Sequence, residues 1–221
     1  HFIGFSDQTR EELVKWGILE SRIHVLGIPI SPKFTLKHKT REYREKHGLK
    51  PDLFTVLLTS GSFGMGPIEK IIDILNQYCG ELQIAVVCGN NGALLKRLAA
   101  KTFCVHVRVF PFIDFMDELM EASNIIITKS GGLTMCESLA KELPMIITRP
   151  IPGQETYNAD FLLEHDAAFR IYSVEEIRTV MDSVMSDFAV LDRKRENIRK
   201  IRKPLATRDI ADFIESLVTG T

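Results

Sequence analysis

Short apolar runs alternate with longer helix-forming segments along most of this chain, and this alternation constrains the fold more than any other feature. The runs are rich in Val, Ile and Leu, as buried parallel strands are. Six of them are each followed by a segment of helical length: 53–59, 82–88, 105–110, 124–128, 144–148 and 168–172. Strands that alternate with helices predict a doubly wound, mostly parallel α/β domain of the Rossmann-like type.

The first part of the chain has a shorter pattern of its own. The sequence predicts a strand over His1–Phe5, a helix from Asp7 to about Trp16, and a second strand over 22–26. Two prolines then stiffen Gly27–Pro32 and exclude a helix there. This stretch is therefore expected to be an extended linker.

We place a domain boundary at about residue 30 because of this linker. Residues 1–30 are then one unit with its linker, 31–190 form the main domain, and 191–221 hold a basic segment and a final amphipathic helix. We expect that helix to dock on the core with its charged face outward. The chain begins with His1 and not with methionine, so we expect it to be a fragment whose upstream part is missing.

The formal net charge of −1 at pH 7 argues against a nucleic-acid-binding protein. Two segments, 33–50 and 193–203, are nevertheless basic. For 33–50, two interpretations remain open: a solvated helix before the first core strand, or a surface for anionic lipid headgroups. No apolar run approaches the ~20 residues of a membrane span.

The chain has four cysteines, none of which forms a Cys-x-x-Cys pair: Cys79, Cys88, Cys104 and Cys136. Two of them lie inside apolar runs, as buried free thiols do. We therefore expect neither a zinc site nor a disulfide framework, and a reducing compartment fits this pattern best.

A tight turn after the run at 124–128 is the strongest functional signal. Ser130-Gly131-Gly132 leads directly into helix-forming residues that begin at Leu133. The first turn of a helix has unpaired backbone N–H groups and the positive end of the helix dipole, which together suit a phosphate. Glu137 follows near the end of the second turn, where a carboxylate could reach a ribose hydroxyl. The plainer alternatives are a sharp strand-to-helix turn and a surface glutamate.

Three further loops leave the carboxyl ends of predicted strands, where open parallel sheets bind ligands. Gly61–Gly66 is rich in glycine, which lets backbone N–H groups approach a phosphate. Phe110–Asp114 could hold a base, and Ile151–Asn158 contains amide and carboxylate groups suited to sugar hydroxyls. Each loop alone also fits an ordinary turn or helix start. Their combination on one sheet edge predicts a nucleotide-sugar site.

These motifs resemble the donor domain of the family 28 glycosyltransferases. The similarity rests on Ser130-Gly-Gly-x-Thr134 with Glu137, and on Pro150-x-Pro-Gly-Gln-Glu-x-x-Asn-Ala159. It extends from about residue 5 to residue 185. Within the family, the chain is most similar to the processive diacylglycerol glucosyltransferases and the monogalactosyldiacylglycerol synthases. The resemblance implies the C-terminal half of a two-domain GT-B fold, with a UDP-sugar in the cleft between two Rossmann-like halves.

The resemblance also implies roles for individual residues. The groups that would face the diphosphate are Gly61, Ser62, Gly131, Gly132, Leu133 and Thr134, and Ser130 just before this turn would also belong to the donor site. The Phe112 backbone would hold the uracil and Glu137 the ribose. The donor sugar would be bound by Gln154, Glu155 and Asn158, with Asn90 as a looser contact.

The implied reaction is the inverting transfer of a hexose from a UDP-sugar to a diacylglycerol-type lipid, with no metal and no cofactor. The chain has no Asp-x-Asp pair, in agreement with a metal-free site. The general base is expected in the missing N-terminal domain, so no catalytic residue is assigned. This chain alone should bind a UDP-sugar weakly without turnover.

The resemblance places the enzyme in the cytoplasm, peripheral at the inner face of the cell membrane. Three alternatives remain open at this stage. The chain could belong to an N-acetylglucosaminyltransferase of cell-wall lipid intermediates, to a non-catalytic nucleotide-sugar-binding module, or to an epimerase of the same architecture.

Overall fold

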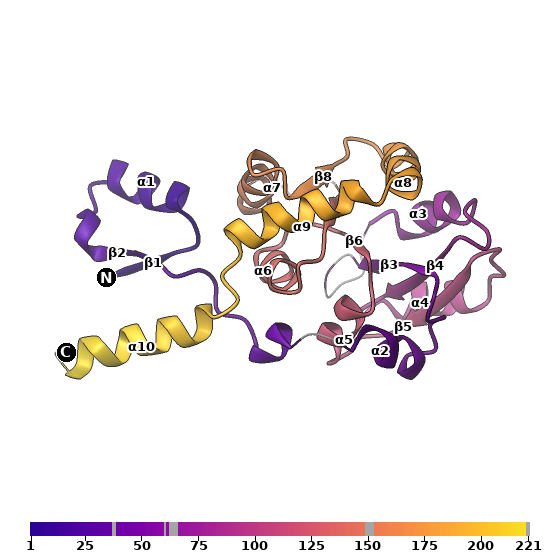
Figure 1. Ribbon diagram of the computed structural model, residues 1–221, viewed down its shortest axis with the longest axis horizontal. Coiled ribbons are helices and arrows are strands. Elements are labelled where there is room, and N and C mark those ends of the chain that lie inside the picture. Colours follow the sequence, from indigo (N-terminus) through magenta and orange to yellow (C-terminus); the bar gives the residue numbers. More distant parts are fainter. Residues whose placement is uncertain (37–38, 60, 62–65, 149–152, 220–221) are drawn as a thin grey trace.

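The computed structural model describes residues 1–36, 39–59, 61, 66–148 and 153–219. A six-stranded parallel sheet in the order β5-β4-β3-β6-β7-β8 forms the centre of the main domain (Figure 1). Its strands are β3 (Phe54–Thr59), β4 (Leu82–Val87), β5 (His106–Phe110), β6 (Ile125–Thr128), β7 (Met145–Ile147) and β8 (Ala168–Arg170). The order reverses between β3 and β6, which is the Rossmann arrangement. The predicted fold class is therefore confirmed.

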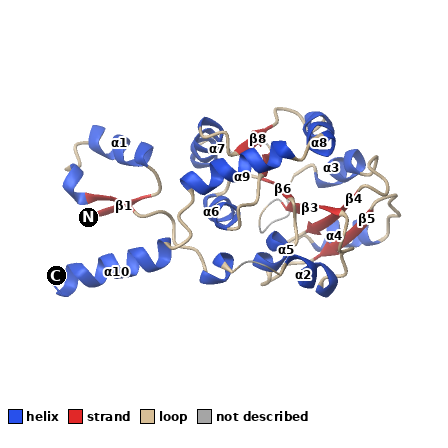
Figure 2. Cartoon of the chain, viewed as in Figure 1, coloured by secondary structure: helices blue, strands red, loops and turns tan. Residues whose placement is uncertain are grey.

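Helices cover both faces of this sheet, so its inner strands are apolar on both sides (Figure 2). Val56 packs with one cluster, under α3 (Ile68–Leu75), α4 (Gly92–Ala99) and α8 (Glu176–Ser186). Leu57 packs with the other, under α5 (Met116–Glu121), α6 (Gly132–Ala140) and α7 (Gln154–Glu164). Helix α9 (Ala189–Ile201) contributes Leu191 to the first cluster and Ile198 to the second. These elements follow the predicted pattern with bounds that differ by a few residues.

The basic segment 33–50 folds as a 3-10 turn, η2 (Pro32–Thr35), and a short helix, α2 (Thr40–Lys46). Its described cations are largely paired within the protein. Arg41 lies 3.3 Å from Glu45, and Lys46 lies 2.7 Å from Glu118 of α5. Arg44 is buried and donates to Ala122 O, Pro51 O and Asn124 Oδ1. These contacts favour the interpretation as a solvated helix packed on the domain over a surface for lipid headgroups.

The first 25 residues form a small unit beside the main domain (Figure 1). Strands β1 (Phe2–Gly4) and β2 (Ile23–Val25) pair in parallel, and α1 (Asp7–Lys15) connects them through the turn η1 (Glu20–Arg22). Ser6 caps α1, because its hydroxyl accepts a hydrogen bond from the Thr9 N–H at 3.3 Å. The predicted strand, helix and strand are all present.

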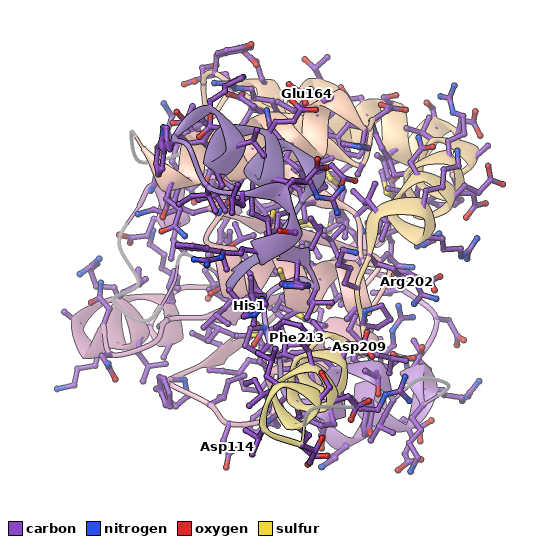
Figure 3. The ribbon with its side chains drawn as sticks, turned by 90° about the vertical axis from the view of Figure 1, so that its left-hand side faces the viewer. His1, Asp114, Glu164, Arg202, Asp209 and Phe213 are labelled. Atoms are coloured by element: carbon purple, nitrogen blue, oxygen red, sulfur yellow. A yellow bond between two sulfur atoms is a disulfide. The ribbon has the colours of Figure 1, made fainter. Side chains whose placement is uncertain are left out.

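Helix α10 (Ala206–Thr219) leaves the main domain and lies beside this small unit. Figure 3 shows Phe213 of α10 next to His1. The ring centroids of these two residues are 5.6 Å apart, and those of Phe213 and His24 are 4.0 Å apart. The prediction that the last helix docks on the core is wrong, because α9 occupies that place and Ala206 is the one buried residue of α10.

Two segments connect the small unit with the main domain, and they touch at Gly27. This residue has a φ of +95°, and a Cβ built on it would lie 3.0 Å from the Cβ of Lys203 and 3.1 Å from that of Ala206. Both the left-handed backbone and the close approach require glycine here. The linker after β2 and the segment before α10 are therefore packed side by side.

Cys79 and Cys104 form a disulfide, with their Cα atoms 5.3 Å apart. The expectation that the cysteines form no disulfide is wrong for this pair. The physical reason is topological: Cys79 precedes β4 and Cys104 precedes β5, and these strands are parallel neighbours, so both cysteines lie at the same edge of the sheet. Cys88 and Cys136 are buried free thiols.

In the part of the chain described above, no helix combines the length and the apolar character that crossing a bilayer requires.

Candidate functional site

The turn between β6 and α6 lies at the switch point of the sheet. Gly131 occupies the N-cap position of α6 with φ −63° and ψ 136°, and no side chain caps the helix there. The backbone N–H groups of the first turn, Gly132 to Thr134, therefore remain available to an anion. Leu133 projects into solvent, and Thr134 is half-buried. This geometry agrees with the predicted phosphate turn.

Gly132 packs closely against the linker. A Cβ at this position would lie 3.3 Å from Ile28 Cδ1, whereas a Cβ at Gly131 would meet nothing within 4 Å. The turn therefore has one glycine that the neighbouring linker restricts and one that faces open space.

Ser130 joins this turn to helix α7. It is completely buried, and its hydroxyl donates to the carbonyl oxygen of Glu155 at 2.6 Å. In return, the Asn158 side-chain amide donates to the Ser130 carbonyl oxygen at 2.8 Å. The Ser130 hydroxyl proton is therefore engaged by the Glu155 carbonyl, and this side chain holds the turn against α7. Asn158, also buried, acts here as a brace between α7 and the turn before α6.

Helix α7 begins beside the same turn. Its N-cap, Gly153, has a φ of +105°, which only glycine adopts without strain. Gln154 is exposed, and its Nε2 lies 4.0 Å from the point where a Cβ on Gly132 would be. Glu155 is half-buried in the first turn. The structure therefore brings the predicted sugar residues of α7 next to the predicted phosphate turn.

Glu137 lies two turns into α6, half-buried and without a hydrogen bond or ion pair to any described residue. Burial raises the pKa of its carboxyl to about 7, with Lys33 acting in the opposite direction and Asp117 adding to the rise. A half-buried carboxylate with no described partner, such as that of Glu137, is suited to accept hydrogen bonds from hydroxyl groups of a ligand.

Lys33 of η2 connects the linker to this region, and no sequence motif predicted this role. Its ammonium lies 3.2 Å from Asp117 Oδ1 and donates to the Asp114 carbonyl oxygen. Sequence reasoning grouped Lys33 with the other basic residues of 33–50. Its partners lie more than 80 residues further along the chain, and no local motif reports such a contact.

Phe112 is 61% exposed at the tip of the loop between β5 and α5. The loop rests on a cluster beneath it, in which the His47 and Phe115 rings stack with centroids 4.5 Å apart. His47 Nε2 also lies 2.7 Å from Glu118 Oε2. Burial opposes ionisation of Glu118, but the hydrogen bonds from Lys46 and His47 outweigh it and lower the pKa. The loop thus presents its backbone from a well-supported base.

The remaining predicted residues lie further from this centre or outside the described part. Gly61 is exposed with a φ of +74°, and Ser62 lies outside the described residues. Asn90 is exposed in the turn after β4, one strand away from the switch point, and no described contact joins it to the other site residues. Its neighbour Asn91 caps α4 by accepting from the Leu94 N–H at 2.9 Å.

A cavity of about 350 Å³ lies between the small N-terminal unit and α7. Its walls include Gln154, Asn158 and Ile28, so it opens next to the Gly131–Gly132 turn. Within 1–36, 39–59, 61, 66–148 and 153–219, no group of three His, Cys, Asp or Glu side chains is arranged to hold a metal ion.

Comparison with known proteins gives a consistent result. The family model described as glycosyltransferase family 28 C-terminal domain matches residues 55–213. The processive diacylglycerol beta-glucosyltransferase of Bacillus subtilis is 30% identical over 200 residues, which are 89% of this chain and 52% of that protein. Monogalactosyldiacylglycerol synthase 2, chloroplastic, of Arabidopsis thaliana is 32% identical over 210 residues, which are 91% of this chain and 45% of that protein.

The chain thus spans about half the length of the curated relatives it matches. Among solved structures, the S. aureus MnaA-UDP co-structure superimposes with a TM-score of 0.71 at 14% identity, over 97% of this chain and 60% of that one. At that identity, the likeness concerns the fold alone.

Proposed function

Because the chain belongs to the family of glycosyltransferase family 28 C-terminal domains, we propose that it is the donor-nucleotide domain of a hexosyltransferase. The donor is a UDP-hexose and the acceptor a diacylglycerol-type lipid at a membrane surface. The names of the two curated relatives support this acceptor class. The enzyme acts from the cytoplasmic side, peripheral to the inner face of the cell membrane.

The observation that carries the proposal is the convergence of three features at one switch point. The uncapped first turn of α6 offers N–H groups to a diphosphate, and Glu137 is a half-buried carboxylate without a described partner. Gln154 lies within reach of the same turn. Diphosphate, ribose and hexose are the three parts of a UDP-sugar that these groups match.

The chemistry of this half is the stabilisation of a leaving group. As the bond between the hexose and the diphosphate breaks, negative charge grows on UDP. We expect the backbone N–H groups at Gly132 to Thr134 and the positive end of the α6 dipole to stabilise that charge without a metal. The base that activates the acceptor is assigned to no residue of this chain.

Calorimetric titration of the 221-residue chain with UDP tests the proposal. We expect weak binding, with a dissociation constant between about 10 µM and 1 mM. Thr134→Ala and Glu137→Gln should each weaken it by about tenfold, the effect of losing one good hydrogen bond to a charged group. No heat at millimolar UDP from a chain whose circular dichroism is that of an α/β fold would reject the assignment.

The same titration with UDP-glucose, UDP-galactose and UDP-N-acetylglucosamine separates the donor classes. A preference for either simple hexose supports transfer to a glycerolipid. A preference for the N-acetylated donor would instead favour the enzymes of cell-wall lipid intermediates.

A further inference from the structure

The cavity beside the phosphate turn has two walls from different parts of the chain. Helix α1 contributes Gln8, Thr9 and Glu12, and helix α7 contributes Gln154 and Tyr157. Its volume, about 350 Å³, falls in the range of small-molecule sites. The α7 wall belongs to the site described above, whereas the α1 wall has no role in it so far.

The α1 wall is held in place by an aromatic contact. The ring of Phe5, just before α1, meets the ring of Phe161 of α7 edge-on, with centroids 4.8 Å apart. Such pairs stabilise an interface beyond the area that they bury. Ile28 lines the same cavity and lies against Gly132. The cavity is therefore a built space between the two units, and it adjoins the turn that would bind the diphosphate.

The polar groups of the α1 wall are not all equivalent. The Ser6 and Thr9 hydroxyls lie 3.3 Å apart and satisfy each other. The Gln8 amide and the Glu12 carboxylate, in contrast, make no hydrogen bond to any described residue, and both line the cavity. They are the groups on this wall that remain free to bind a ligand.

The chemistry of the two walls matches a pyranose ring. A hexose presents hydroxyl groups at its rim and a patch of C–H groups on its face. The amides of Gln8 and Gln154 can donate hydrogen bonds to hydroxyls and accept them, and the Glu12 carboxylate can accept them. Tyr157, which is 58% exposed, offers an aromatic surface for the C–H face.

We propose that Gln8 and Glu12 of α1 bind hydroxyl groups of a hexose opposite Gln154, and so contribute to sugar specificity. This inference rests on the proposed function, because it takes the cavity as the continuation of the UDP site. It assigns a part in sugar recognition to the small N-terminal unit, in which the sequence analysis predicts no site residue.

The experiment compares UDP with UDP-glucose on the 221-residue chain by calorimetry. Glu12→Gln and Gln8→Ala should leave the affinity for UDP unchanged within about twofold, because UDP has no hexose. Each should weaken UDP-glucose binding by about fivefold or more, in line with the loss of one hydrogen bond. Glu11→Gln is the matched control: this neighbour lies on the same helix, is exposed and does not line the cavity. It should change neither affinity.

The hexose could be carried by the donor or by a glycolipid acceptor, and a second arm separates these sources. The chain is saturated with UDP and titrated with octyl glucoside below its micelle concentration. A Glu12→Gln effect on UDP-glucose places the donor hexose in the cavity. An effect on the glucoside alone places the acceptor hexose there. Either result supports the hexose subsite.

Two results overturn the inference while leaving the proposed function intact. One is UDP and UDP-glucose affinities that fall equally in the variants. The other is no change for either UDP-glucose or the glucoside in variants whose melting curves match the wild type. Failure of the wild type to bind UDP at all would instead reject the proposed function, and the hexose subsite with it.

Discussion

The side-chain amide of Asn158 in α7 donates to the carbonyl oxygen of Ser130, in the turn before α6, at 2.8 Å. Asn158→Asp would replace that donor by a buried carboxylate facing a carbonyl oxygen. We expect a loss of about 2–3 kcal/mol in the free energy of unfolding, measured by urea denaturation. Asp160→Asn on the same helix removes an ion pair with the partly exposed Arg170 and should cost less than about 1 kcal/mol. Equal losses would contradict the role of Asn158 as a brace.

Glu137 should make the protein less stable as the pH rises. Burial raises the pKa of its carboxyl from 4.5 to about 7, so between these values the folded state holds a proton that the unfolded state has released. The stabilising effect is complete below pH 4.5 and is lost as the pH passes 7. After allowance for partial exposure, the wild type should lose about 1–2 kcal/mol from pH 5 to pH 8 relative to Glu137→Gln. Thermal melts of both proteins across this range check the difference, and parallel curves would contradict it.

Lys33 should shift the pH at which the affinity for the nucleotide rises, because its charge lowers the pKa of Glu137. UDP-glucose is the suitable ligand, since its diphosphate stays fully ionised across the range. Its affinity should rise by about tenfold from pH 6 to pH 8, as the Glu137 carboxyl ionises and accepts the ribose hydroxyls. Lys33→Met removes the positive charge that lowers this pKa and releases Asp117 and the Asp114 carbonyl. The rise should then move to higher pH.

The control for Lys33 is Lys39→Met, since Lys39 pairs with Glu42 on α2 and has no described contact with the site. Its pH profile should equal that of the wild type. In the double variant Lys33→Met/Glu137→Gln, the profile should be flat. A persisting pH-dependent rise would show that another group titrates.

The Cys79–Cys104 cross-link should respond to reductant. It closes a loop with a sequence separation of 25 residues, for which the chain-entropy estimate is about 3 kcal/mol. Dithiothreitol should lower the melting temperature of the wild type by several degrees. It should not change the melting temperature of Cys79→Ser. The double variant Cys79→Ser/Cys104→Ser should have the same melting temperature as Cys79→Ser. A non-reducing peptide map that finds both thiols free in air-oxidised protein would rule the link out.

Arg44 should be the most sensitive position in the basic segment 33–50. It is buried and donates to three acceptors: the Pro51 carbonyl before β3, and the Ala122 carbonyl and Asn124 Oδ1 between α5 and β6. Asn124 Oδ1 also accepts from the Thr55 N–H. Arg44→Met removes the donor to the Ala122 and Pro51 carbonyl oxygens and one of two donors to Asn124 Oδ1, and it should cost about 3 kcal/mol or more. Arg41→Met, on the same helix, removes a largely exposed cation and should cost less than about 1 kcal/mol. Urea denaturation of the two variants decides the comparison.

The sheet could be predicted from the sequence because each strand carries its own signal. Runs such as Phe54–Thr59 are buried on both faces, so their composition alone identifies them. The glycine turn at 131–132 is equally local, since strand, turn and helix are contiguous in the chain. These features need no knowledge of what lies beside them.

The contacts that the sequence did not predict are long-range. Cys79 and Cys104 meet only because β4 and β5 are neighbours. Lys33 contacts Asp117, which lies more than 80 residues further along the chain. Ser130 was predicted as a donor-site residue, and its bond to the Glu155 carbonyl, 25 residues further along the chain, had no local signal. No residue type or spacing specifies such choices; packing of separate elements does.

The contact of Gly27 with Lys203 and Ala206 has a mechanical consequence. Two units joined by one chain segment can change their relative orientation in many directions. Two connecting segments that pack against each other restrict this motion to rotation about one hinge. We expect the small unit and α10 to rotate together about this contact when the Phe5–Phe161 ring contact opens. The distance between α1 and α7 would then change, and a side chain at position 27 would obstruct the rotation.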